Sequence, residues 1–333
     1  MHKMWTFLEK LLARADGMLP SIMAFVILIW AIVGLWWLFA CFLEFLAFVY
    51  VHFLRRGRRA KQIQAKYGEW VTVVVSSCAP DAMRLAIMSE FARHGFNILL
   101  LVVNSRRIRA DAGSTVQIEE EMREMHRELK AAGPTPKEMR IVRMELPGSP
   151  EKITDLLKQL PAGASLRFFI MLTSAQSSLT HPSDFLEANV LLPTFISKLM
   201  HTNSESFPEP GLIVHVASVA DRIIFPHQSL LGASQAFLLQ ISRYHKYYAH
   251  QHVKTQMMLC LADPAKPGSL LYTSHGAFAA DVLRCVDYDD LVAPSWVQAP
   301  LVWLARVLPE RLMVLLAWLV SPHHRRAQDD KQA

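Results

Sequence analysis

The chain has 333 residues, of which 52% are hydrophobic, and its mean hydropathy of +0.20 is high for a water-soluble protein. The length suits one membrane segment and one globular domain of roughly 250 residues. The four cysteines lie far apart in the sequence, which argues against a disulfide framework and a zinc site, and we expect no bound metal. Much of the net charge of +6 comes from residues 55–59 (Arg-Arg-Gly-Arg-Arg), directly after an apolar run. This position is typical of a membrane flank, so we expect no nucleic-acid partner.

The apolar run extends from residue 18 to residue 54 and contains one charged residue, Glu44. A transmembrane helix needs about 20 apolar residues, so the run is too long for one upright helix and short for two. We predict a single span, and the alternative is a tight hairpin that turns near Gly34 and the pair Trp36-Trp37. Glu44 would either pair with a polar group on a partner helix or lie near the membrane interface. The excess of lysine and arginine after the run predicts a globular domain on the cytosolic side, or on the matrix side of a mitochondrial membrane.

After the basic cluster, buried strands alternate with helices. Strands are predicted at 70–75, 97–103, 140–146, 166–172, 212–217 and 256–261, and helices at 81–94, 117–132, 150–160, 185–201 and 229–250. This alternation predicts an α/β fold with a Rossmann-like, doubly wound parallel sheet. Residues 296–320 are rich in Trp, Leu and Val and predict amphipathic helices that lie on the membrane or cover the domain.

The sequence divides into five parts. They are an N-terminal amphipathic segment at 1–17, a transmembrane segment at 18–54, a basic linker at 55–66, a globular domain at 67–290, and C-terminal apolar helices with a polar tail at 291–333.

Three stretches of the sequence resemble one known superfamily. They are Lys66-Tyr67-Gly68-Glu69-Trp70 before the first strand, residues 211–218 ending at Ser218, and Leu308-Pro309-Glu310-Arg311-Leu312 near the C-terminus. Together with the order of elements, they resemble the short-chain dehydrogenases/reductases. More narrowly, they are similar to the membrane-anchored branch that contains 17β-hydroxysteroid dehydrogenases and very-long-chain 3-ketoacyl-CoA reductases. The resemblance implies an NAD or NADP cofactor held by a glycine-rich loop, and a catalytic tetrad of Asn, Ser, Tyr and Lys.

The cofactor loop departs from the family pattern. The family has Thr-Gly-x-x-x-Gly-x-Gly, in which absent side chains let the backbone and a helix N-terminus approach the pyrophosphate. The matching positions here are Ser77, Cys78, Ala82 and Arg84, so no glycine remains, and Pro80 removes an amide donor. We therefore expect no bound cofactor and regard the loop as degenerate.

The catalytic tetrad is half lost. Asn189 and Ser218 match the asparagine and serine positions, whereas Leu231 stands at the tyrosine position and Gln235 at the lysine position. Leucine cannot exchange a proton, and glutamine carries no charge to lower the pKa of a neighbour. No tyrosine of the chain has a lysine four residues later, so we expect no catalytic residues.

These departures favour a pseudoenzyme that is anchored in a membrane, contacts its lipids, and acts as a structural or accessory subunit of a membrane complex with protein partners. One alternative is an active NAD(P)H-dependent oxidoreductase of lipid metabolism, reducing a 3-ketoacyl-CoA or a steroid. The other is a lipid or acyl-chain binding protein. The resemblance implies the endoplasmic reticulum, and the mitochondrial inner membrane is the alternative location.

Overall fold

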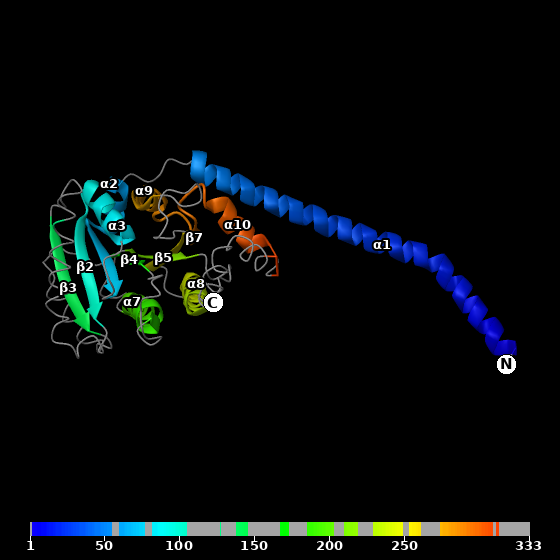
Figure 1. Cartoon of the computed structure of the whole chain (residues 1–333). Helices are drawn as coiled ribbons and strands as arrows, with labels where there is room; N and C mark the ends of the chain where they lie inside the picture. The colour runs from blue at the N-terminus through cyan, green and yellow to red at the C-terminus, as the bar shows by residue number, and fades with distance from the viewer. Residues whose placement is uncertain are drawn as a thin grey trace, which may run out of the picture. The chain divides into compact units, whose positions relative to one another are not determined.

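A computed structural model describes residues 2–54, 60–76, 82–104, 127, 138–145, 167–172, 185–202, 210–218, 229–248, 253–260, 274–308 and 311–312. The chain divides into two units, Met1–Arg56 and Gly57–Ala333. Figure 1 shows a single long helix in the first unit and a layered sheet with helices in the second.

The first unit is one helix, α1 (His2–Val49), which continues as a π-helical turn η1 (Tyr50–Leu54). The helix passes through Gly34 and the pair Trp36-Trp37 without a break, so the hairpin alternative is not formed. Within the part of the chain that the structure describes, Met23–Leu54 is the one helix long and apolar enough to cross a membrane. The predicted single N-terminal helix is therefore present.

The second unit is built on a parallel sheet with the strand order β3-β2-β1-β4-β5-β6-β7. The predicted fold class is confirmed, and the ends of the six predicted strands lie within three residues of the observed ones. The seventh strand, β7, was not predicted because it has only two residues and is defined by its pairing with β6. The strands are β1 (Trp70–Ser76), β2 (Asn97–Asn104), β3 (Met139–Glu145), β4 (Phe168–Leu172), β5 (Gly211–Ser218), β6 (Val253–Cys260) and β7 (Leu291–Val292).

Helices cover both faces of this sheet. In Figure 1, α7 and α8 lie on one face and α3 and α9 on the other. The helices of this unit are α2 (Ala60–Tyr67), α3 (Ala82–Arg93), the π-helical segment η3 (Glu187–Leu191), α7 (Leu192–Thr202), α8 (Ser229–Tyr248), α9 (His275–Cys285) and α10 (Ala299–Val307). The predicted helix 150–160 lies outside the described residues, as does 117–132 apart from Arg127, which is helical.

Two helices differ from the sequence predictions. Residues 60–66 of the expected linker belong to α2, because Ile63 and Tyr67 are one turn apart and both are buried. Helix α9 was not predicted, although Ser274 caps its start by accepting a hydrogen bond from Ala277 N at 3.3 Å. Gly95 follows the end of α3 with a φ of +82°, which residues other than glycine rarely adopt.

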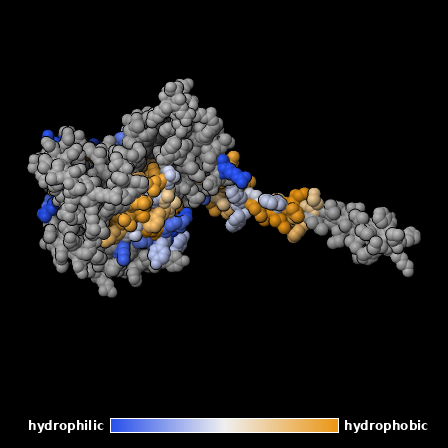
Figure 2. All heavy atoms as spheres, turned by 60° about the horizontal axis from the view of Figure 1, so that its bottom comes forward, coloured by the Kyte–Doolittle hydropathy of each residue, from blue (hydrophilic) through white to orange (hydrophobic). Residues whose placement is uncertain are grey.

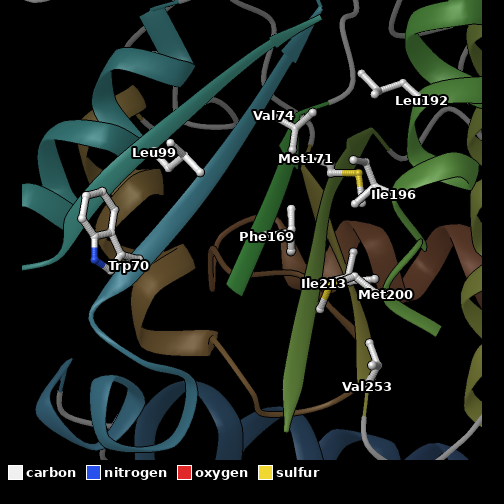
Figure 3. Close-up of a cluster of buried hydrophobic side chains, with 10 residues drawn as sticks. All are labelled: Trp70, Val74, Leu99, Phe169, Met171, Leu192, Ile196, Met200, Ile213 and Val253. Carbon is white, nitrogen blue, oxygen red and sulfur yellow. The ribbon is translucent and has the colours of Figure 1, made fainter. Parts of the chain in front are cut away.

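A hydrophobic core lies between α7 and the sheet. Strands β1, β2, β4, β5 and β6 each contribute inward side chains, and α7 contributes three at helical spacing (Figure 3). This cluster consists of Trp70, Val74, Leu99, Phe169, Met171, Leu192, Ile196, Met200, Ile213 and Val253. Because the strands are parallel, their carboxyl ends meet at one edge of the sheet, where the loops that would form a site begin.

Candidate functional site

The order of the sheet places a site between β1 and β4, where the direction of strand succession reverses. Open α/β sheets bind ligands at this point, beyond the carboxyl ends of the strands. Of the sequence-predicted residues, Ser218 ends β5, Asn189 lies in η3, and Leu231 and Gln235 lie on α8. Ser77 and Cys78 lie outside the described residues, whereas Ala82 and Arg84 lie in the first turn of α3.

Asn189 and Leu231 meet around Phe185. The Asn189 side chain is buried, and its Nδ2 donates a hydrogen bond to the carbonyl oxygen of Phe185 at 3.1 Å. The Phe185 side chain packs against Leu231, and both are buried, with the half-buried Leu230 beside them. The widened turn of η3 contains Asn189, and such π-helical turns are frequent at functional sites. The position at which the resemblance expects a proton donor is therefore part of a closed apolar contact.

Gln235 lies one helical turn beyond Leu231 and is fully buried, with 0% of its surface exposed. Among the described residues, neither its amide nitrogen nor its amide oxygen has a hydrogen-bond partner. Leaving a buried amide unsatisfied costs about 1–3 kcal/mol for each group. The side chain is neutral, so it cannot supply the positive charge that the family lysine brings to this place.

One buried titratable residue was missed by the sequence analysis. His215 lies in the middle of β5, and the alternation of the strand puts it on the same face as Ile213, toward α7. Burial, and secondarily the charge of His245 on α8, lower the pKa of His215 to about 4. The imidazole is therefore neutral at pH 7, and its complete burial keeps substrates away from it. The sequence feature that indicates such a buried histidine is its place inside the apolar run 212–217.

Three of the described residues differ from the family residues with which the resemblance aligns them, namely Arg84, Leu231 and Gln235. Arg84 is buried in α3, and the resemblance aligns it with a glycine that allows close helix packing in the family. Leu231 and Gln235 offer neither a phenol nor an ammonium group to the nicotinamide end. Across the described ranges, no group of three or more His, Cys, Asp or Glu residues is arranged to hold a metal ion.

No family model and no curated protein matches the sequence. Solved structures do match the fold. One of them concerns the stereoselectivity of a 7β-hydroxysteroid dehydrogenase. Its sequence is 18% identical to this chain, the alignment covers 77% of this chain and 98% of that one, and the TM-score is 0.52. The globular unit therefore shares the Rossmann-like fold of this dehydrogenase structure.

Two other solved structures share parts of this fold at lower similarity. A short-chain dehydrogenase from Sphingobium yanoikuyae in complex with NADPH is 17% identical, with 67% of this chain and 86% of its own covered and a TM-score of 0.46. A short-chain dehydrogenase from Mycobacterium smegmatis is 13% identical, with 68% and 91% covered and a TM-score of 0.48. At these identities the likeness concerns the fold, so any reaction must be argued from this chain's own residues.

Proposed function

We propose that this chain is a non-catalytic, membrane-anchored protein of short-chain dehydrogenase fold, and that it acts as a structural or accessory subunit of a membrane complex. The observation that carries the proposal is the buried contact between Leu231 and Phe185. A proton donor at this position would have to face the substrate, whereas leucine has no proton to give and is packed against a phenyl ring. Gln235, one turn further on, supplies no charge.

A binding role is supported by an apolar surface on the globular unit. Figure 2 is turned so that the side of α7 and α8 faces the viewer, and it shows an apolar patch on this face. Large side chains of η3, α8 and the residues before η3 are 40–70% exposed, namely Leu186, Leu191, Phe237, Tyr244 and Tyr247. Contiguous apolar patches on a protein surface commonly mark interaction sites.

Membrane attachment is supported by the long apolar helix α1 and by the arginines that follow it. Anionic headgroups attract such a cluster, and by the positive-inside rule the globular unit would face the cytosol or the mitochondrial matrix. The resemblance to the membrane-anchored steroid and 3-ketoacyl-CoA branch favours the endoplasmic reticulum, with the mitochondrial inner membrane as the alternative.

Nucleotide binding to the full chain, purified in detergent, tests the proposal. The melting temperature is measured with and without millimolar NADPH or NADH, and an active short-chain dehydrogenase is carried through as a positive control. A ligand at 100 times its dissociation constant would stabilise the folded state by about 2.7 kcal/mol, which gives a clear shift. We expect no shift for this chain and a shift for the control.

The two alternatives give different results in the same preparation. An active oxidoreductase would show a shifted melting temperature with nucleotide and would oxidise NADPH in the presence of a 3-ketoacyl-CoA or a steroid ketone. A lipid-binding protein would show no nucleotide shift but would bind a fluorescent fatty acid to saturation without turnover. Either result would contradict the accessory role proposed above.

A further inference from the structure

The two helical faces of the sheet differ in the side chains that they expose. On the face of α3 and α9, charged residues pair within each helix. Glu90 Oε2 lies 3.5 Å from Nη1 of Arg93, and Asp281 Oδ1 lies 2.9 Å from Nη2 of Arg284. None of the large hydrophobic side chains described in these two helices is exposed. Balanced charge without exposed apolar groups is typical of a surface that faces water.

The face formed by α7 and α8 has a different charge. The two helices are in contact with each other, and neither contains an aspartate or a glutamate. Lys198 on α7 is exposed and Arg243 on α8 is half-buried, and neither has an ion-pair partner among the described residues. Lys246 on α8 is paired with Asp290. This face therefore carries positive charge that no acidic residue of its own two helices balances.

The exposed aromatic side chains of α8 form one stripe along the helix. Phe237, Tyr244 and Tyr247 are 40%, 60% and 70% exposed, and their spacing of seven and three residues places them on one side of the helix. Gln240 lies between them and is also exposed. From Phe237 to Tyr247 the stripe extends about 15 Å. Leu191 on the neighbouring η3 is 59% exposed, and Figure 2 shows the apolar patch on this side of the unit.

Exposed aromatic rings beside cationic side chains suit the headgroup layer of a membrane. Tyrosine concentrates at this layer, because its ring is apolar and its hydroxyl can remain in water. Lysine and arginine lay their aliphatic stems on apolar surface while their charged ends reach anionic headgroups. The α7/α8 face offers both kinds of group and no acidic side chain of α7 or α8 that would repel such headgroups.

We propose that the α7/α8 face binds the surface of a lipid bilayer that contains anionic headgroups. The long apolar helix α1 and the arginines that follow it would hold the globular unit near such a surface. Binding of the face is then an intramolecular step with a high effective concentration, so a small contact area is sufficient. The inference rests on the membrane attachment in the proposed function and names lipid as the partner of this face.

The test uses the full chain with a coumarin-bearing amino acid in place of Gln240. The matched position is Ala280 of α9, which is exposed on the opposite face. Each protein is reconstituted in vesicles of phosphatidylcholine with or without phosphatidylserine, and some headgroups carry a nitroxide that quenches nearby fluorophores. With phosphatidylserine we expect strong quenching at 240 and little at 280. Quenching at 240 should fall in phosphatidylcholine alone, and at about 1 M salt, where the Debye length is about 3 Å.

A pair of charge variants tests the cations. Lys198→Gln combined with Arg243→Gln should lower the ratio of bound to unbound α7/α8 face by about 5-fold for each charge removed. Arg93→Gln combined with Arg284→Gln removes the same charge from the opposite face and should leave the quenching at 240 unchanged. Equal losses in the two double variants would mean that net charge alone draws the unit to the membrane, and would overturn the assigned face.

An aromatic variant tests the stripe. Tyr244→Ser combined with Tyr247→Ser removes two exposed rings, so the fold should be kept, which circular dichroism verifies. We expect weaker quenching at 240 in the vesicles with phosphatidylserine. Unchanged quenching in this folded variant would contradict the role of the aromatic stripe and overturn the proposed contact.

Insertion is measured first, by resistance of the vesicle-bound chain to alkaline extraction. A chain that is extracted would overturn membrane attachment, and the proposed function with it. An inserted chain whose probes at 240 and 280 are quenched equally, or not at all, would overturn this inference alone. Energy transfer between copies labelled at 240, without quenching by lipid, would assign the face to a second copy of the chain and overturn the lipid contact.

Discussion

The Lys66 Nζ atom lies 2.8 Å from Oδ2 of Asp287, and this ion pair joins α2 to the turn after α9. On the other side of the carboxylate, Nζ of Lys254 on β6 lies 3.3 Å from Oδ1. Burial by itself raises the pKa of Asp287, but hydrogen bonds from Lys66 and Tyr67 and the two lysine charges outweigh it, so the pKa is lowered. One buried carboxylate thus connects the first helix of the globular unit to its last long strand.

Asp287→Asn should lower the free energy of unfolding by about 2 kcal/mol at pH 7, less than for a fully buried pair because both lysines reach solvent. Asparagine also tolerates the φ of +60° at this position, so the backbone is not strained. The stabilisation by Asp287 is present above the ordinary carboxyl pKa and is lost as the pH falls through the lowered one, so the two proteins should converge in strong acid. Urea unfolding of the two proteins at pH 7 and in strong acid measures the difference in their free energy of unfolding.

Asp281→Asn is the matched control for that experiment. Its carboxylate contacts Arg284 at 2.9 Å within α9, and the arginine side chain is exposed. A pair of this kind contributes about 0.5 kcal/mol or less. Equal losses in the two variants would show that Asp287 has no special connecting role.

The lowered pKa of His215 predicts that the free energy of unfolding of the globular unit falls at acid pH. Its pKa is lowered from 6.5 to about 4 in the folded protein, so the unfolded chain binds the proton more tightly. Stability is therefore full above pH 6.5 and falls by about 1.4 kcal/mol per pH unit until the folded pKa is reached, about 3 kcal/mol in all. In His215→Leu this slope should be largely absent, apart from a smaller contribution of His245, whose pKa burial also lowers. Unfolding curves between pH 7 and 4 that keep the original slope in the variant would contradict this assignment.

The strands were predictable, because their signals are local. Runs such as 70–75 and 97–103 are almost entirely apolar, which is typical of parallel strands that are covered on both faces. The contact of Phe185 with Leu231 was not predictable, since it depends on how η3 and α8 pack, and neither residue alone carries a pattern. The two-residue strand β7 exists only through its pairing with β6. The degenerate loop at Ser77 and Cys78 lies outside the described residues and stays a prediction.

Two fully buried glutamines offer a paired test of the unsatisfied amide. Gln256 Nε2 donates to the carbonyl oxygen of Cys285 at 2.8 Å, and its Oε1 accepts from Asp287 N at 2.9 Å. Gln235 has neither kind of bond among the described residues. Methionine has nearly the same volume and no such requirement, so Gln235→Met should raise the free energy of unfolding by about 1 kcal/mol. Gln256→Met should lower it by about 2 kcal/mol, and thermal unfolding of both would compare them. A loss of stability in Gln235→Met would mean that its amide is satisfied in the folded protein.

Restoring the family residues by Leu231→Tyr and Gln235→Lys should not restore a reductase. The new lysine at 235 would lie in a fully buried position, where desolvation opposes its charge. The new tyrosine at 231 would have to fit where the leucine now packs on Phe185. The cofactor loop would still lack its glycines. NADPH oxidation with a 3-ketoacyl-CoA is the measurement, with circular dichroism to verify folding and Leu231→Tyr alone as the milder variant. Turnover by a folded double variant would show that a working nucleotide pocket has been kept, and the accessory role would then have to be abandoned.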